Sequence, residues 1–346
     1  MQALILAGGK GVRLRPLTIY TPKPVVPVMN RPFLLYQIDI LRLSGVTDII
    51  LSLNYQPDKI EDILGDGSKY GVKLTYLTEP QPLGTAGAFG FARKLITRPT
   101  VVLNGDILTN VQISRMAEAH KEKKAEATIY LTPVENPTAY GLVETGEDMK
   151  VARFLEKPKA DEVEKLTTKN INAGIYILEP SVLELIPEGE NYSFEYSVFP
   201  ELLKREKNFN AFIDPEAYWR DIGTPQSYLE AHADFLAGKV TGFSLDGQKA
   251  DSPAAGGAID EASVLDTGCV IKAGARVINS VLGQGVHLDE KATVENSVVW
   301  SHTHIGNSAI VRNSFIGRGC HIGNDVVVED GSVLGDKTSL THYTKV

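Results

Sequence analysis

The sequence has little of several features that mark particular classes of protein. Only two of its 346 residues are cysteines, Cys269 and Cys320, so a disulfide scaffold is not indicated and a reducing compartment is expected. There is no excess of positive charge, and the net charge of −8 argues against general binding to nucleic acid or to a membrane surface. No apolar run approaches the ~18–20 residues of a membrane span, and the N-terminal run ends at Leu6, too early for a signal peptide. We therefore expect a cytoplasmic protein with no nucleic-acid partner and no membrane partner.

Short apolar segments and segments of helical spacing alternate through the first half of the chain. The expected strands cover residues 2–6, 48–53, 73–77 and 100–103, and the expected helices cover 32–44, 58–64 and 85–95. This alternation indicates a mostly parallel sheet with helices on both faces. Later segments favour further strands, some of them antiparallel, at 127–132, 141–144, 151–155 and 172–177, and helices at 194–206 and 225–237. Ligands of such sheets bind beyond the carboxyl ends of the strands, which places Gly8, Asn54 and Asp106 on one rim.

The last third of the chain has a different period. Apolar residues recur in steps of six, with a few steps of five, from Ile259 to Leu334. A parallel β-helix of hexapeptides has this period, and an ordinary β-sandwich with regular strands is the alternative. Three histidines of this region, His302, His304 and His321, match no usual zinc spacing, and we interpret them as turn residues. The expected domains are 1–240, a linker at 241–257, and a β-helix at 258–346.

Glycines directly follow the first expected strand. Gly8, Gly9 and Gly11 leave backbone N–H groups uncovered, and basic residues stand beside them, which suits a polyphosphate. Two other phosphate motifs are excluded. Walker A requires Ser or Thr after the lysine, but Lys10 is followed by Gly11, and Leu14 stands where the dinucleotide fingerprint requires its third glycine.

Several short motifs occur across nearly the whole chain. They are the stretch 4–18, continued in 21–24, and the segments 83–87, 104–106, 140–141, 154–158, 171–174 and 219–223. Together they resemble the signature of the sugar-1-phosphate nucleotidylyltransferases. The resemblance implies a Rossmann-like, mixed, mostly parallel α/β sheet with helices on both faces, followed by a left-handed parallel β-helix. Within the family, segments 32–37, 171–176 and 194–200 are most similar to the mannose-1-phosphate guanylyltransferases.

The resemblance also implies an activity. A nucleotidyl group would pass from a nucleoside triphosphate to a sugar 1-phosphate with release of pyrophosphate, with Mg²⁺ as cofactor. GTP and mannose 1-phosphate are the favoured substrates, and a glucose-1-phosphate uridylyl- or thymidylyltransferase is the alternative. A non-catalytic subunit that binds nucleotide sugars is an alternative of another class. We also expect a homo-oligomer formed through the β-helix.

The resemblance assigns roles to individual residues. Arg13 would neutralise the leaving pyrophosphate, Lys23 would contact the α-phosphate, and Asp106 and Asp221 would share the metal ion; these four are the expected catalytic residues. The expected nucleotide-binding residues are Leu6, Ala7, Gly8, Gly9, Gly11, Val12, Arg13, Lys23, Gln81, Gly84, Thr85 and Asp106. The expected sugar-phosphate-binding residues are Tyr140, Gly141, Glu156, Lys157, Asn172, Gly174 and Asp221. Thr85 is also a candidate cap for the helix that begins there.

One residue departs from the family pattern. The family usually has Thr or Ser at the position of Val12, where the hydroxyl would contact a phosphate. Because one hydrogen bond contributes only about 0.5–1.5 kcal/mol net, we expect the change to weaken nucleotide binding more than turnover.

Overall fold

The structure is a computed structural model that describes residues 1–159, 163, 168–244, 256–329 and 331–346. The chain divides into two compact units that do not follow its linear order. The first unit comprises residues 1–9 and 36–219, and the second comprises 10–35 and 220–346. The expected linker at 241–257 lies largely outside the described residues, so the domain boundaries stay a prediction. Among the described residues, no helix has the length and apolar character needed to cross a membrane.

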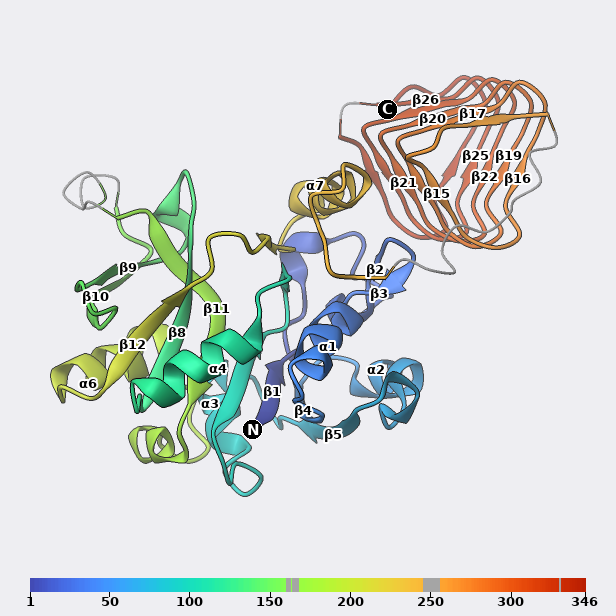
Figure 1. Cartoon of the computed structure of the whole chain (residues 1–346). Helices are drawn as coiled ribbons and strands as arrows, with labels where there is room; N and C mark the ends of the chain where they lie inside the picture. The colour runs from blue at the N-terminus through green and yellow to red at the C-terminus, as the bar shows by residue number, and fades with distance from the viewer. Residues whose placement is uncertain (160–162, 164–167, 245–255, 330) are drawn as a thin grey trace. The chain divides into compact units, whose positions relative to one another are not determined.

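A nine-stranded sheet forms the centre of the first unit (Figure 1). Its strands are β1 (Gln2–Leu6), β4 (Asp48–Leu53), β5 (Lys73–Thr78), β6 (Thr100–Asn104), β8 (Ala127–Pro133), β9 (Gly141–Thr145), β10 (Val151–Glu156), β11 (Asn170–Leu178) and β12 (Phe209–Ile213). The order is β10-β9-β11-β6-β1-β4-β5, and β8 pairs with β11 and β12. β1 runs parallel to β4 and β6, whereas β11 runs antiparallel to β6 and β8. The expected mixture of parallel and antiparallel strands is therefore present.

Helices cover both faces of this sheet. They are α1 (Leu34–Leu43), α2 (Pro57–Leu64), α3 (Gly84–Phe91), α4 (Ile113–Glu122) and α6 (Phe199–Lys204), with a π-helical turn at Phe194–Val198. Successive residues of a strand point to opposite faces, and Val101, Val102 and Leu103 of β6 all have no exposed surface. Leu4 and Tyr176 belong to one buried cluster that also includes side chains of α3 and α6. Both faces of the central strands are therefore packed, as expected from their continuous apolar sequence.

The second unit contains a parallel β-helix, visible at the red end of the chain in Figure 1. Three five-stranded parallel sheets form its sides, in the orders β14-β17-β20-β23-β26, β15-β18-β21-β24-β27 and β16-β19-β22-β25-β28. These strands are β14 (Ala258–Ile259), β15 (Val264–Leu265), β16 (Val270–Ile271), β17 (Arg276–Ile278), β18 (Val281–Leu282), β19 (His287–Leu288), β20 (Thr293–Glu295), β21 (Val298–Val299), β22 (His304–Ile305), β23 (Ile310–Arg312), β24 (Phe315–Ile316), β25 (His321–Ile322), β26 (Val327–Val328), β27 (Val333–Leu334) and β28 (Ser339–Leu340). The predicted α/β sheet followed by a left-handed β-helix is confirmed, and the β-sandwich alternative is wrong.

The interior of the β-helix explains the period seen in the sequence. Val277 lies opposite Val294 and Val294 opposite Val311, each 17 residues further on, whereas Ile259 and Val277, and Ile316 and Leu334, are 18 apart. A central coil therefore has two steps of six and one step of five, an end coil has three steps of six, and each step begins with an inward-pointing apolar residue. Of the three histidines expected in turns, only His302 lies at one, with φ of 59°. His304 and His321 begin strands β22 and β25, so that expectation is wrong for them.

Helix α7 (Pro225–Leu236) and residues 10–35 belong to the same unit as the β-helix. Thr224 and Ser227 form a capping box at the start of α7, which explains why the helix begins at Pro225. Short strands β2 (Pro27–Val28) and β3 (Arg31–Pro32) form a hairpin in the N-terminal segment. The side-chain amide of Asn30 donates to the Leu282 carbonyl at 2.9 Å, so this segment is bonded to the β-helix.

Candidate functional site

Three neighbouring strands of the first unit end beside the glycine-rich stretch. The amide of Ala7 donates to the Ser52 carbonyl at 2.9 Å, which joins the ends of β1 and β4. A Cβ atom at Gly105 would lie 2.6 Å from the Leu6 carbonyl oxygen, so only glycine fits where β6 ends. A Cβ atom at Gly8 would lie 3.3 Å from Asn54. The structure thus brings the predicted rim together, and Asp106 lies in the turn that follows β6.

A buried carboxylate connects this rim to the start of α3. Glu79 is 7% exposed, and it accepts hydrogen bonds from the Ser52 hydroxyl at 2.8 Å and from the Leu83 amide at 3.0 Å. Leu83 precedes Gly84, the first residue of α3. Glu79 therefore fixes the start of the predicted nucleotide-binding helix relative to β4. The sequence reasoning missed this residue, because a lone Glu after a strand carries no motif.

The glycines of α3 let another segment of backbone approach closely. Gly84 has φ of +74°, and a Cβ atom there would lie 2.6 Å from the Tyr192 carbonyl oxygen. That oxygen accepts hydrogen bonds from the amides of Ala86 and Gly87, both at 3.0 Å. Two N–H groups of the first turn of α3 are therefore satisfied by protein, and Gly84 and Gly87 are required for this packing.

Thr85 does not cap the helix, which corrects that expectation. The N-cap residue is Leu83, and no side-chain cap is present there. The Thr85 hydroxyl instead donates to the Glu195 carboxylate at 2.8 Å and accepts from the Phe194 amide at 2.9 Å. Thr85 therefore ties α3 to the π-helical turn. Gln81, another of the expected nucleotide-binding residues, is exposed in the loop before α3.

A second group of predicted residues gathers where β9, β10 and β11 lie side by side. A Cβ atom at Gly141 would lie 2.8 Å from a carboxylate oxygen of Glu156. The backbone amide of Lys157 donates to the Tyr140 carbonyl at 3.0 Å. The side chain of Lys157 is 62% exposed, and its ammonium lies 3.9 Å from Glu156. The predicted residues Tyr140, Gly141, Glu156 and Lys157 are therefore neighbours.

Asn172 and Gly174 complete this group from β11. The Asn172 amide donates to the Tyr176 hydroxyl at 2.9 Å, and its carbonyl oxygen accepts from the Gly174 amide at 3.0 Å. The Tyr176 hydroxyl lies 3.5 Å from Glu195, which also accepts from the Ser193 hydroxyl at 2.6 Å. Asn172, Tyr176 and Glu195 therefore form one polar network beside the buried cluster of the sheet.

The charges of this network shift its pKa values. Burial raises the pKa of Glu156, the nearby Glu195 carboxylate raises it further, and Lys157 partly opposes both. Burial likewise raises the pKa of Tyr176 well above its ordinary value, and Glu195 adds to the shift. The site thus holds two carboxylates beside a neutral phenol, which is an arrangement suited to accepting hydrogen bonds from a polyol.

Glu195 and Tyr176 were missed as site residues, although both lie in segments that carry the family resemblance. Segments 171–176 and 194–200 contain these two residues, but nothing in the sequence distinguishes them from the core residues beside them.

The remaining predicted residues lie in the second unit. A Cβ atom at Gly223 would lie 2.8 Å from a carboxylate oxygen of Asp221 and 3.1 Å from the guanidinium of Arg13. Gly11 has φ of +60°, and a Cβ atom there would lie 3.1 Å from the Cβ of Lys23. Val12 is 57% exposed at the start of the 3-10 turn Val12–Leu14.

The predicted site residues therefore divide between the two units. The first unit holds Leu6, Ala7, Gly8, Gly9, Gln81, Gly84, Thr85, Asp106, Tyr140, Gly141, Glu156, Lys157, Asn172 and Gly174. The second unit holds Gly11, Val12, Arg13, Lys23 and Asp221. The binding roles of these residues stay predictions.

Known proteins similar to this chain match both parts of it. The family described as "Nucleotidyl transferase" matches residues 2–238, and the "EIF2B subunit epsilon LbH domain" matches residues 249–346. A mannose-1-phosphate guanylyltransferase of Mycobacterium tuberculosis is 36% identical over 80% of this chain and 76% of its own length. A mannose-1-phosphate guanyltransferase of Yarrowia lipolytica is 42% identical over 68% of this chain, which spans 64% of that relative. The crystal structure of HddC from Yersinia pseudotuberculosis matches with a TM-score of 0.58 and 33% identity, over 68% of this chain and 99% of that one.

Proposed function

Because the chain belongs to the nucleotidyl transferase family, we propose that it transfers a guanylyl group from GTP to mannose 1-phosphate, which yields GDP-mannose and pyrophosphate. The chain is an enzyme of the nucleotidyltransferase type. The observation that carries the proposed substrates is its 36% identity, over 80% of the chain, to a mannose-1-phosphate guanylyltransferase.

The proposed reaction is an in-line displacement at the α-phosphorus. An oxygen of the sugar phosphate forms a bond to this phosphorus, and the bond to the bridging oxygen of the β-phosphate breaks. The attacking phosphate is already anionic, so no general base is needed, and the negative charge moves to pyrophosphate. The protein must therefore align two polyanions and stabilise the charge of the leaving group.

We assign the charge-stabilising role to Arg13 and Lys23. Arg13 and Lys23 are the cations that the family resemblance assigns to the triphosphate, and each lies beside a glycine of the second unit, Gly223 and Gly11. Pro22 and Pro24 flank Lys23 in a 3-10 turn, which limits where its ammonium can point. The glycines after β1 would bind the triphosphate through their backbone N–H groups.

The network at β9 to β11 is proposed to hold the sugar. A partly buried carboxylate such as Glu156 can accept hydrogen bonds from two neighbouring hydroxyl groups. A sugar with one hydroxyl inverted would leave an oxygen of Glu156 without a hydrogen bond. That sugar would therefore bind more weakly than its epimer. Glu195 would add a second acceptor, and Lys157 would bind the sugar phosphate.

A divalent metal ion is general for this family, and we propose Mg²⁺. Asp106 and Asp221 present carboxylate oxygens, the hard donors that Mg²⁺ prefers, so these residues fit the ion. When bound, the ion would neutralise phosphate charge and hold the reacting groups in line. Asp106 belongs to the first unit and Asp221 to the second, so their sharing of one ion is part of the proposal.

A substrate panel tests the proposal. GTP, ATP, UTP and dTTP are each combined with mannose 1-phosphate or glucose 1-phosphate, and pyrophosphate release is measured. We expect the highest kcat/KM for GTP with mannose 1-phosphate. A preference for UTP or dTTP with glucose 1-phosphate would instead establish the alternative sugar-1-phosphate nucleotidylyltransferase.

Substitution of Asp106 tests the metal assignment. We expect Asp106→Asn to lose Mg²⁺-dependent turnover, whereas the control Asp62→Asn, on the exposed side of α2, should retain it. Full activity of Asp106→Asn would refute the metal assignment. Binding of GDP-mannose by the wild-type protein without any turnover would refute catalysis and favour the non-catalytic alternative.

Self-association and compartment belong to the same proposal. We propose a homo-oligomer formed through the β-helix, which light scattering at micromolar concentration tests; a monomer would refute it. The proposed compartment is the cytoplasm, which is supported by Cys269 and Cys320 being free and buried thiols.

A further inference from the structure

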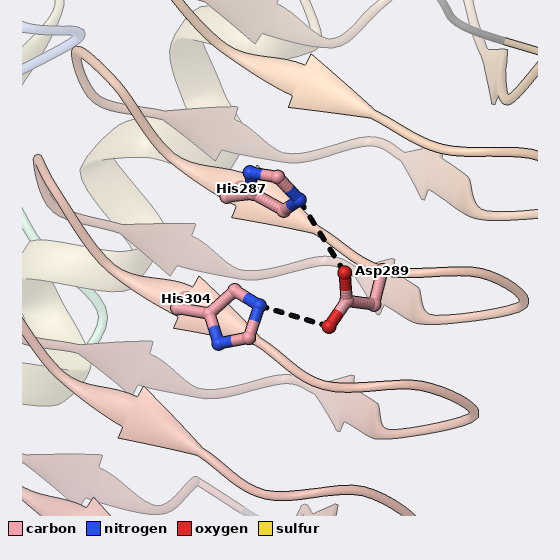
Figure 2. Close-up of side chains that lie close together, drawn as sticks. All are labelled: His287, Asp289 and His304. Carbon is pink, nitrogen blue, oxygen red and sulfur yellow. Dashed lines mark ion pairs between the residues drawn. The ribbon is translucent and has the colours of Figure 1, made fainter.

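The outer face of the β-helix carries a cluster of potential metal ligands that lies outside the site described above. His287 and His304 begin strands β19 and β22 and are direct partners in the parallel ladder. Asp289 follows β19 at the next corner. Figure 2 shows the two imidazole rings directed at this carboxylate from adjacent coils. His287 Nε2 lies 3.3 Å from one oxygen of Asp289, and His304 Nε2 lies 2.8 Å from the other.

The spacing of these atoms fits a small cation. One ligand atom from each of the three residues lies within 4.8 Å of the other two. Tetrahedral Zn²⁺ has ligands at about 2.0–2.1 Å, which places any two ligand atoms about 3.3 Å apart. Each histidine nitrogen faces its own oxygen of Asp289, at 3.3 Å and at 2.8 Å. Side-chain rotations are therefore needed to bring one Asp289 oxygen and both nitrogens to the separation of zinc ligands.

His287 has a polar atom without a hydrogen bond. Its Nε2 is shielded from solvent, and within the described part of the chain it makes no hydrogen bond. Its contact with Asp289 at 3.3 Å meets the ion-pair distance but not hydrogen-bond geometry. A buried nitrogen directed at a carboxylate without bonding to it leaves a desolvation cost that a metal ion between them would offset.

Two residues beside the cluster affect its ability to bind a metal ion: His321 orients His304, and Lys272 competes with a metal ion for Asp289. His304 Nδ1 lies 3.2 Å from His321 Nδ1, and the two rings stack with centroids 5.1 Å apart. A hydrogen bond from the second ring nitrogen is the usual way in which a metal-binding histidine is oriented. The Lys272 ammonium lies 2.7 Å from Asp289 and 3.8 Å from Glu290, so it already neutralises the carboxylate that a metal ion would bind.

We propose that His287, Asp289 and His304 form a binding site for a transition-metal ion of the Zn²⁺ type. Two imidazoles and one carboxylate favour such an ion over Mg²⁺ or Ca²⁺, which select all-oxygen sites. The ion links two successive coils and keeps a coordination position for water. When it binds, Lys272 moves from Asp289 to Glu290. This site is separate from the proposed Mg²⁺ site in both ligands and location in the sequence.

Metal counting on the full-length protein tests the proposal. The protein is stripped with EDTA and dialysed against Zn²⁺ with excess Mg²⁺, and bound zinc is measured by mass spectrometry. The difference between wild type and His304→Gln isolates this site from any zinc held elsewhere. We expect that difference to be one ion per chain, and we expect His287→Gln to show the same loss. His302→Asn, an exposed turn residue of the same β-helix, is the matched control and should retain the ion.

Two further variants separate the metal site from a plain ion pair. His321→Gln should weaken zinc binding by about 10–100-fold, the usual effect of removing a group that orients a ligand. Lys272→Met should tighten it, because it removes the competing cation. Equal zinc content in wild type, His287→Gln and His304→Gln would overturn the proposal. So would looser binding by Lys272→Met. Circular dichroism checks that each variant is folded. If a histidine variant does not fold, the zinc affinity of Lys272→Met still tests the proposal.

Discussion

Replacing Tyr228 by phenylalanine should destabilise the second unit by about 2–4 kcal/mol. Tyr228 lies on α7 and has no exposed surface. Its hydroxyl donates to the Pro27 carbonyl and accepts from the indole Nε1–H of Trp300, at 2.9 Å for the second bond. One oxygen atom thus joins the N-terminal segment, α7 and the β-helix. Removing it leaves a buried acceptor and a buried donor without partners, each costing about 1–2 kcal/mol.

Urea unfolding followed by fluorescence measures this effect directly. The chain has two tryptophans, so Trp300 supplies part of the signal from within the affected region. Tyr343→Phe is the matched control, because Tyr343 lies in the same unit and is 79% exposed; it should change stability by less than about 0.5 kcal/mol. A Tyr228→Phe effect as small as that of the control would refute the bridging role of the hydroxyl.

A double-mutant cycle separates the two bonds of Tyr228. In a Trp300→Phe background the indole donor is already absent, so only the Pro27 carbonyl is left unpaired by Tyr228→Phe. The cost of that substitution should therefore fall by about 1–2 kcal/mol. If Tyr228→Phe lowers the free energy of unfolding equally in wild type and in Trp300→Phe, the hydrogen bond between the indole and the hydroxyl does not contribute to stability.

Three further substitutions have outcomes fixed by the geometry of the site. Burial and Glu195 raise the pKa of Glu156 in the folded protein, so the folded state binds this proton more tightly than the unfolded chain. Wild type should therefore gain stability relative to Glu156→Gln as pH falls through the pKa of Glu156 in the folded protein. Thermal melts of both proteins from pH 8 to 5 measure this, and a difference in melting temperature that stays constant with pH would contradict it. Val12→Thr at its exposed position should lower KM for the nucleotide up to about tenfold without changing stability; an unchanged KM would show that no phosphate contact forms there. Gly84→Ala, with a Cβ atom 2.6 Å from the Tyr192 carbonyl oxygen and a left-handed backbone, should cost more than about 1 kcal/mol in urea unfolding, and a neutral result would mean that the loop moves freely.

Regular periodicity made most of the fold predictable. Strand β1 matches its expected bounds of 2–6, and the β-helix follows from apolar residues alone, because each step of its coil repeats the same inward position. Helix α4 and strand β12 were not predicted. Strand β12 pairs with β8 far from it in sequence, and a short segment whose burial depends on a distant partner has no local signal strong enough to identify it.

The candidate site was predictable only in part. Gly8 was predicted from its position directly after an apolar strand, whereas Gly141 and Glu156 were predicted only from motifs that resemble those of the family. Glu79 was not found, because its function is to join β4 to α3 through two hydrogen bonds that no spacing rule describes. The histidine cluster was hidden for a different reason. His287 and His304 are neighbours only because one coil takes 17 residues, a distance at which sequence motifs are not searched.

The length of a coil also determines which insertions the β-helix can accept. Because each inward residue of the central coils stacks on the one 17 residues before it, and those of the end coils on residues 18 before them, an insertion of one complete coil leaves all existing ladders in register. An insertion of one residue within a strand would instead turn the following apolar side chains outward, because successive side chains of a strand point to opposite faces. Natural variation in the length of this region should therefore come in whole coils or as loops at the corners. A protein engineered with one additional coil should lengthen by one strand spacing, about 4.8 Å, and unfold at a higher temperature.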